Sequence, residues 1–113
     1  MCVAVREIDP MGLAAAGREG AVVVDVRAPT ESALGIVPCA RLVPLGSLGR
    51  RADEIRHDTR AAQPVYLICR TGVRSADAAR MLTREGVHAV SVSGGTEAWK
   101  SAGLPVVAGT HAC

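Results

Sequence analysis

Short apolar runs alternate along the chain with segments whose apolar residues recur at helical spacing. The apolar runs predict five strands, at Val3–Val5, Ala21–Val26, Leu42–Val43, Val65–Cys69 and Ala89–Ser93. The segments between them predict four helices, at 9–16, 47–57, 75–85 and 96–102. Strands that alternate with helices favour right-handed crossovers, so we expect an α/β fold. Its central, mainly parallel five-stranded sheet would lie between two layers of helices.

The size and composition of the chain fit one domain over residues 1–113. The chain has a mass of 11.7 kDa, with 49% hydrophobic and 21% charged residues, and this mix excludes a disordered or fibrous protein. The apolar runs are too short to cross a bilayer, and Arg6, Glu7 and Asp9 interrupt the region where a secretion signal would lie. We therefore expect a cytoplasmic protein with no membrane partner.

Charge and aromatic content argue against nucleic acid as a partner. One Trp, one Tyr and no Phe leave no aromatic platform for stacked bases. The net charge of +2 is small. In the densest basic stretch, Arg50–Arg60, acidic residues are interleaved with the arginines, which is typical of a solvated helix face.

The four cysteines are widely spaced, at Cys2, Cys39, Cys69 and Cys113. Because no secretion signal accompanies them, we expect reduced thiols that need separate explanations. Cys39 is a packing residue, the interpretation we favour, or a resolving thiol; Cys2 carries no signal, and Cys113 is prone to adventitious oxidation. The three histidines have no ligand spacing with one another or with cysteine, so no metal site is expected.

The segment after the fourth expected strand carries the candidate chemistry. Cys69 ends that strand and Arg74-Ser75 open the next helix, so backbone N–H groups and the helix terminus form an anion cradle. Gly72 permits the tight curl, and Arg70 and Arg74 add positive charge. These surroundings favour the thiolate of Cys69, which predicts a nucleophile for an anionic or polarised substrate. The alternative is a small apolar residue that merely ends a core strand.

Three motifs in order resemble those of the rhodanese family of single-domain sulfurtransferases. The loop Cys69-Arg70-Thr71-Gly72-Val73-Arg74-Ser75 matches the family's active-site pattern at every defined position. Asp25-Val26-Arg27 with Glu31 matches its early signature. The closing signature is matched by Gly94-Gly95, Trp99 and Gly103-Leu104-Pro105-Val106. The resemblance covers about residues 3–107 and implies a rhodanese-like, three-layer fold.

Two departures from the family pattern lie outside the cysteine loop. Ser32 stands where an aromatic residue is usual. Gly35-Ile36-Val37-Pro38-Cys39-Ala40 replaces the usual Gly-His-Ile-x-Gly-Ala, so that Ile36 and Cys39 stand in place of His and Gly. We expect these changes to affect local packing and substrate access but not the nucleophile.

The resemblance implies a ping-pong sulfurtransferase that needs no metal or organic cofactor. The Cys69 thiolate would take the outer sulfur of thiosulfate or of a persulfide donor, and the Cys69 persulfide would pass it to cyanide or a thiol. The thiol acceptor would be thioredoxin, glutathione or a sulfur-carrier protein, and a monomer is expected. The loop residues that would bind the donor and stabilise the persulfide are Arg70, Thr71, Gly72, Val73, Arg74 and Ser75.

Other motif residues are expected to support the site rather than to react. We expect Arg27 to pair with Glu31, and Asp25 to brace nearby loop amides. Gly94-Gly95 forms a tight turn, part of the site wall, or both. Trp99 lies in the core or covers the preceding turn.

Two alternative functions share this architecture. Related phosphatases and arsenate reductases have five residues between the cysteine and the arginine, whereas four separate Cys69 from Arg74. The tighter loop suits a persulfide sulfur better than a tetrahedral phosphate, and no leaving-group acid is obvious, although Asp77 and Glu97 stay open. The other alternative is a non-enzymatic module that binds a partner or delivers sulfur only within a complex, and the intact loop argues against it.

Overall fold

Five parallel strands form the central sheet, in the order β1-β5-β4-β2-β3. The computed structural model describes residues 5–59 and 63–108, and Cys2, Val3, His111 and Cys113 lie outside them. The strands are β1 (Arg6–Ile8), β2 (Val22–Asp25), β3 (Arg41–Leu42), β4 (Val65–Ile68) and β5 (Ala89–Val92). Strand β4 lies in the middle of the sheet, where both of its edges are paired. The α/β class and the five-stranded sheet agree with the sequence prediction.

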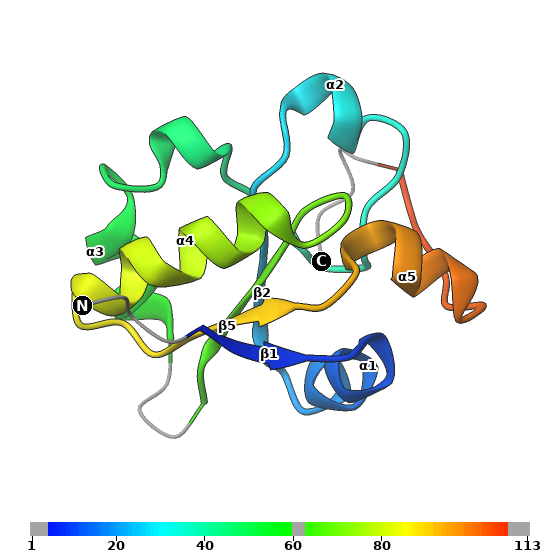
Figure 1. The fold of residues 1–113 in the computed structure, drawn as a ribbon, viewed down its shortest axis with the longest axis horizontal. Coiled ribbons are helices and arrows are strands. Elements are labelled where there is room, and N and C mark those ends of the chain that lie inside the picture. Colours follow the sequence, from blue (N-terminus) through cyan, green and yellow to red (C-terminus); the bar gives the residue numbers. More distant parts are fainter. Residues whose placement is uncertain (1–4, 60–62, 109–113) are drawn as a thin grey trace.

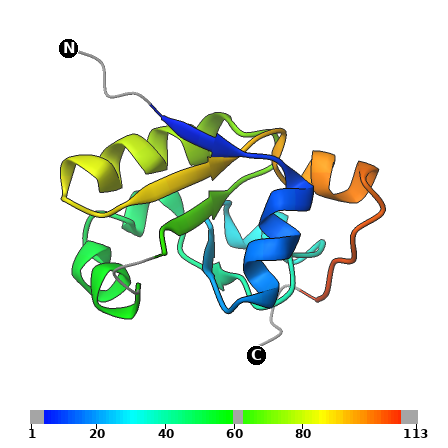
Figure 2. The ribbon, with the colours of Figure 1, turned by 90° about the horizontal axis from the view of Figure 1, so that it is seen from below.

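Helices cover both faces of this sheet. They are α1 (Pro10–Arg18), α2 (Pro29–Ser32), the 3₁₀ turn η1 (Leu45–Ser47), α3 (Ala52–Asp58), α4 (Val73–Arg84) and α5 (Gly95–Ser101). Figures 1 and 2 show α3 and α4 on one face and α1 and α5 on the other. The molecule therefore has three layers, with α2 at one end of the sheet (Figure 1).

Each face of the sheet buries its own apolar cluster. On the α3 and α4 face, Ile55 and Leu82 pack with the strand residues Val24 and Leu67. On the α1 and α5 face, the helix residues Leu13 and Trp99 pack with residues of three strands, Val23, Ile68 and Val92. Alternate residues of β2 and β4 thus enter opposite clusters, as the two-residue period of a strand requires.

Three elements differ from the sequence prediction. The strand predicted at Val3–Val5 lies mostly outside the described residues, and the structure has β1 at Arg6–Ile8. It is an edge strand, where polar residues are tolerated, so its sequence does not stand out as apolar. The segment predicted as one helix over 47–57 holds the end of η1 and, after a break that contains Gly49, the helix α3. The short helix α2 was not predicted; Pro29 occupies its first turn, and Glu31 accepts the Ala28 N–H at 3.2 Å.

The remaining helices are close to their predicted ranges. Asp9 caps α1 by accepting the Gly12 N–H at 2.8 Å, as expected, and the helix continues two residues past the predicted end. Helix α4 begins at Val73, two residues earlier than predicted, directly after the loop glycine Gly72. In the described part of the chain, no helix is both long enough and apolar enough to span a membrane.

Candidate active site

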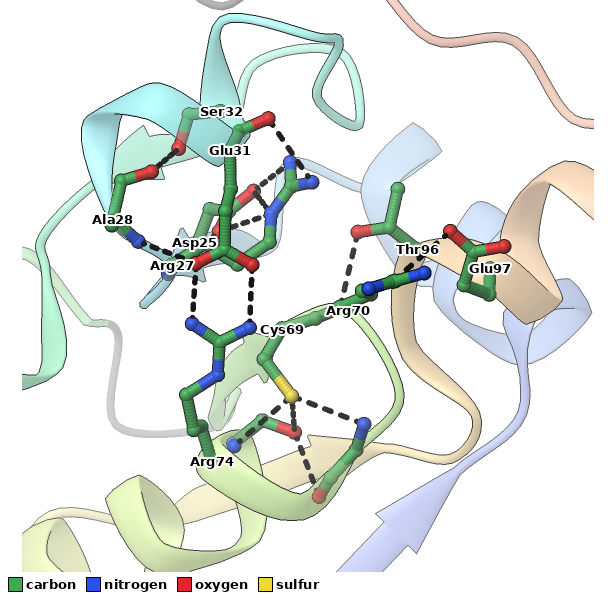
Figure 3. Close-up of polar contacts among 12 residues, drawn as sticks. Asp25, Arg27, Ala28, Glu31, Ser32, Cys69, Arg70, Arg74, Thr96 and Glu97 are labelled. Atoms are coloured by element: carbon green, nitrogen blue, oxygen red, sulfur yellow. Dashed lines mark hydrogen bonds and ion pairs between the residues drawn. The ribbon is translucent and has the colours of Figure 1, made fainter.

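The Cys69 side chain lies at the carboxyl end of the central strand β4, and the residue is 1% exposed. Its sulfur accepts the backbone N–H of Gly72 at 3.0 Å and that of Ser75 at 3.4 Å. The hydroxyl of Ser75 lies 3.5 Å from the same sulfur. Figure 3 shows the sulfur at the centre of these contacts. The loop therefore presents several hydrogen-bond donors to one sulfur atom.

The hydrogen bonds outweigh the effect of burial on the Cys69 thiol. Burial raises the pKa of this thiol because it disfavours the charged form. The side chain and backbone of Ser75 and the backbone N–H groups of Gly72 and Thr71 stabilise the thiolate, and the net effect lowers the pKa below its usual value. The site thus favours the nucleophilic form of the thiol.

Glycine is required where the cysteine loop turns into α4. Gly72 precedes the helix with a φ of 106°, in the left-handed region that side chains disfavour. A Cβ atom there would lie 3.3 Å from the backbone nitrogen of Gly94. The cysteine loop therefore packs directly against the Gly94-Gly95 turn.

The amino end of α5 holds the first two carbonyl groups of the cysteine loop. The N–H and the hydroxyl of Thr96 both donate to the carbonyl of Cys69, at 2.8 Å and 3.1 Å, and the N–H of Glu97 donates to that of Arg70 at 3.1 Å. Gly95 has a φ of 59°, and a Cβ atom on it would lie 2.3 Å from the carbonyl oxygen of Cys69. The Gly94-Gly95 turn is therefore both a tight turn and a wall of the site.

Arg74 is held by Glu31 at the site. Two nitrogens of its guanidinium contact the two carboxylate oxygens at 2.6 Å and 2.7 Å, and Figure 3 shows the paired groups. These hydrogen bonds lower the pKa of Glu31 to about 2. The pair joins α2 to the first turn of α4, so Arg74 bridges back to the scaffold.

The prediction that Arg27 pairs with Glu31 is wrong. The guanidinium of Arg27 contacts the carboxylate of Asp25 instead, at 2.7 Å between Nη2 and Oδ2, and both residues are buried. The same nitrogen donates to the carbonyl of Gly35 at 2.7 Å. Asp25 also accepts the backbone N–H of Arg27 at 3.0 Å, so it braces the loop after β2. Spacing alone could not decide which carboxylate takes which arginine, because that depends on how α2 folds over the loop.

The other loop residues form the rim of the site. Arg70 is 66% exposed, and its Nε lies 3.6 Å from a carboxylate oxygen of Glu97. Thr71 and Val73 are exposed as well. Arg70 is therefore a loosely held positive charge at the mouth, in contrast to Arg74.

Two polar residues near the loop, Ser91 and Thr96, were not predicted from the sequence. Ser91 lies on β5, is fully buried, and its hydroxyl oxygen is 2.8 Å from that of Ser75. A serine within an otherwise apolar strand is the pattern that could have indicated it. Thr96 follows Gly94-Gly95, and no spacing in the sequence indicates that it contacts the cysteine loop.

The departures from the family pattern have local structural effects. Ile36 is fully buried and pairs with Val107, and Ser32 is buried with its hydroxyl donating to the carbonyl of Ala28 at 3.3 Å. Cys39 has a φ of 68°, which explains why a glycine suits this position, and it is disulfide-bonded. The expectation of a reduced thiol is therefore wrong for Cys39, whereas Cys69 is free.

The remaining candidate residues lie apart from the sulfur. Trp99 is a core residue, and its indole N–H donates to the carbonyl of Pro105 at 2.7 Å. Asp77 contacts Arg80 at 2.8 Å. Over residues 5–59 and 63–108, no group of three His, Cys, Asp or Glu side chains could hold a metal ion. A cavity of about 290 Å³ lies between α1, α5 and residues 37–39, and no residue of the cysteine loop lines it.

The fold and the site together define an α/β protein with a buried thiol, whose surroundings favour its thiolate form, in a tight loop at the carboxyl end of a parallel strand. Residues 12–102 match the family model described as Rhodanese-like domain. The chain belongs to this family, as its three motifs suggested.

Individual relatives and structures agree with this assignment. A protein named sulfurtransferase from Allochromatium vinosum is 37% identical over 107 residues, which cover 92% of this chain and 96% of that protein. The thiosulfate sulfurtransferase GlpE of Actinobacillus pleuropneumoniae is 35% identical over 89 residues, which cover 78% of this chain and 79% of that one. The crystal structure of a rhodanese-related protein from Thermoplasma volcanium matches with a TM-score of 0.76 at 31% identity, over 90% of this chain and 97% of that one.

Proposed function

We propose that this protein is a sulfurtransferase that carries sulfane sulfur as a persulfide on Cys69, with thiosulfate or a persulfide as donor. The observation that carries the proposal is the set of groups around one sulfur: two backbone N–H groups donate to it, and the Ser75 hydroxyl lies 3.5 Å away, where it can donate to the thiolate. The names of the relatives, sulfurtransferase and thiosulfate sulfurtransferase, support the same class of reaction.

In the first half-reaction, the Cys69 thiolate attacks the outer sulfur of thiosulfate. A bond forms between the Cys69 sulfur and that outer sulfur as the sulfur–sulfur bond of thiosulfate breaks, and the electron pair of the broken bond leaves with sulfite. The products are sulfite and an anionic Cys69 persulfide, so total charge is conserved. The donors that stabilise the thiolate also suit the anionic persulfide, because both carry their charge on sulfur.

In the second half-reaction, a nucleophile takes the outer sulfur. Cyanide forms a carbon–sulfur bond to it and leaves as thiocyanate, while the electrons of the sulfur–sulfur bond return to Cys69 as thiolate. A thiolate acceptor would leave as a persulfide in the same manner. We propose that the acceptor in the cell is glutathione, thioredoxin or a sulfur-carrier protein. We expect the transfer to take place in the cytoplasm.

The two loop arginines differ in what they offer the donor. Arg74 is committed to Glu31, with both of its contacts under 3 Å, and is therefore suited to hold the loop in shape. Arg70 is exposed, and its contact with Glu97 is 3.6 Å, so it is free to turn toward an anion at the mouth. We assign donor attraction to Arg70 and loop positioning to Arg74.

A steady-state assay with thiosulfate or a small persulfide as donor, and cyanide or glutathione as acceptor, tests this function. We expect parallel double-reciprocal lines, as ping-pong transfer requires, and no turnover for Cys69→Ser. Arg70→Ala should raise the KM for thiosulfate about tenfold and change kcat little, because a lost charge-assisted contact costs about that factor. Arg80→Ala, an exposed arginine on α4 paired with Asp77, is the matched control and should leave both constants unchanged.

The same assay separates the alternatives. No turnover with any small donor would contradict the proposal and favour a module that acts only within a complex. Hydrolysis of an aryl phosphate that depends on Cys69 would instead favour phosphoryl chemistry.

A further inference from the structure

Ser91 is a buried polar residue in a strand whose four residues are all buried. It lies on β5, beside β4, in register with Leu67 two residues before Cys69. Its hydroxyl oxygen is 2.8 Å from that of Ser75, which in turn lies 3.5 Å from the Cys69 sulfur. Two hydroxyl groups thus lead from the sheet interior to the nucleophile.

The Ser75 hydroxyl has more acceptors around it than it has protons. It can donate its single proton to the Cys69 sulfur, to the carbonyl of Gly72 at 3.2 Å, or to Ser91. A carbonyl and a thiolate only accept, whereas the hydroxyl of Ser91 can also donate. If Ser75 donated to Ser91, its proton would no longer be available to the sulfur.

We propose that Ser91 is a positioning residue for the nucleophile: its hydroxyl donates to the Ser75 oxygen and so keeps the Ser75 proton on the side of the Cys69 sulfur and the Gly72 carbonyl, where it can bond to the sulfur. A hydroxyl that accepts a hydrogen bond is also a stronger donor, so the chain from Ser91 to sulfur is cooperative. This inference deepens the proposed function, since it rests on Cys69 reacting as a thiolate.

Charged groups around the loop provide a constant background for this effect. They come from β2, α2, the loop itself, α4 and α5, and are Asp25, Arg27, Glu31, Arg70, Arg74 and Glu97. Within residues 5–59 and 63–108, the Ser91 side chain hydrogen-bonds to Ser75 and to no charged group. Substitution of Ser91 by alanine therefore removes its hydrogen bond to Ser75 and leaves these charged groups in place.

The test is the pH profile of Cys69 alkylation by iodoacetamide, read on tryptic peptide 61–70, which contains no other cysteine. For Ser91→Ala we expect the midpoint to move to higher pH and the rate at pH 7 to fall about fivefold, the factor that one net hydrogen bond is worth. The plateau at high pH should not fall, because the thiolate remains fully formed there. Ser93→Ala is the matched control, because the Ser93 hydroxyl contacts only the exposed Glu7, at 3.4 Å, among the described residues.

A second pair of variants covers the case in which Ser91→Ala disturbs the fold. Ser91→Thr and Ser91→Val add similar bulk but differ in the hydroxyl, so we expect only the valine variant to move the midpoint. An unmoved midpoint in folded Ser91→Ala, equal shifts in Ser91→Ala and Ser93→Ala, or equal profiles for the threonine and valine variants would overturn the inference. Because no sulfur donor is used, these outcomes are independent of whether the protein transfers sulfur.

Discussion

Most of the donors around the Cys69 sulfur are backbone groups. The N–H groups of Gly72 and Ser75 are set by the turn between β4 and α4, and among side chains the Ser75 hydroxyl adds its own contact. No single substitution of a side chain removes the backbone part. We therefore expect the reactivity of this thiol to depend on how closely the loop is packed.

Gly95 is where that packing is tightest. A Cβ atom there would lie within 2.6 Å of Cys69 and Arg70 backbone atoms, and its φ is positive. We expect Gly95→Ala to lower the free energy of unfolding by about 2–4 kcal/mol, from backbone overlap and strain together. It should also displace the loop and slow Cys69 alkylation at pH 7. Urea unfolding and the alkylation assay measure the two effects.

Gly17 offers the control for that substitution. It lies inside α1, its φ is not positive, and no neighbouring atom lies within 4 Å of the position that a Cβ atom would take. Gly17→Ala should stabilise the protein by about 0.5–1 kcal/mol, because alanine favours the helix. Equal effects of the two glycine substitutions would contradict the tight packing of the loop on α5.

At the residue scale, the sequence predicted Cys69 and its own loop but not the contacts of that loop with distant parts of the chain. Cys69, Gly72 and Ser75 stand together in one short loop, so their contacts were open to prediction. The pairing of Arg74 with Glu31, 43 residues apart, depends on the placement of α2, which has only four residues and no periodic pattern. The contact between Ser75 and Ser91 depends in the same way on the strand order.

At the scale of elements, the short helix α2 is bound to the helix that follows the cysteine loop. Glu31 binds Arg74 in the first turn of α4, and Arg27 binds the carbonyl of Gly35 just beyond α2. Both ends of this segment are thereby tied to the site. These contacts explain why α2, which buries little apolar surface, holds a defined position.

The pair of Glu31 and Arg74 makes stability depend on pH. The folded state lowers the pKa of Glu31 from 4.5 to about 2, so the pair stabilises the fold at neutral pH. This contribution is lost as the pH falls from about 4.5 to about 2, because the unfolded state then binds the proton first. Glu31→Gln should lower the free energy of unfolding at pH 7 by about 1 kcal/mol, since the pair is partly exposed, and should flatten the pH dependence in this window.

Thermal unfolding of both proteins between pH 2 and pH 7 measures this difference. Asp77→Asn is the matched control, because Asp77 pairs with Arg80 on the open surface of α4 and should contribute less than half as much. A constant difference between wild type and Glu31→Gln at every pH would contradict the role given to the pair.

The elements themselves were largely predictable, and the exceptions share a cause. Strands β2 and β4 lie inside the sheet with most of their residues buried, so the sequence shows them as short apolar runs, Val22–Val24 and Val65–Ile68. Edge strand β1 and the turn-like α2 bury little and carry polar residues, so no apolar period marks them. Short elements whose position is set by distant contacts are the ones that sequence patterns miss.

At the scale of the whole molecule, a buried ion pair lies in the interior at the carboxyl end of the sheet. Asp25 ends β2, and its carboxylate holds the guanidinium of Arg27 within the protein. Removal of one partner leaves the other charge buried and unpaired. We expect Asp25→Ala to lower the free energy of unfolding by about 3–5 kcal/mol, a large part of what a domain of this size has.

Urea unfolding followed by Trp99 fluorescence and by far-ultraviolet circular dichroism measures this loss. The two signals should coincide, because we expect the chain to form one domain that unfolds in a single transition. The double variant Asp25→Ala/Arg27→Met should recover part of the stability, since it removes the unpaired charge. A double variant no more stable than Asp25→Ala would show that the loss comes from packing alone.

The central claim is that Cys69 carries the transferred sulfur, and mass spectrometry tests it most directly. The protein is incubated with thiosulfate, freed of excess donor and digested without a reductant. We expect the mass of one added sulfur atom on peptide 61–70, its loss as thiocyanate after cyanide, and no such adduct in Cys69→Ser. An adduct that persists in Cys69→Ser, or one confined to a peptide that contains another cysteine, would contradict the account.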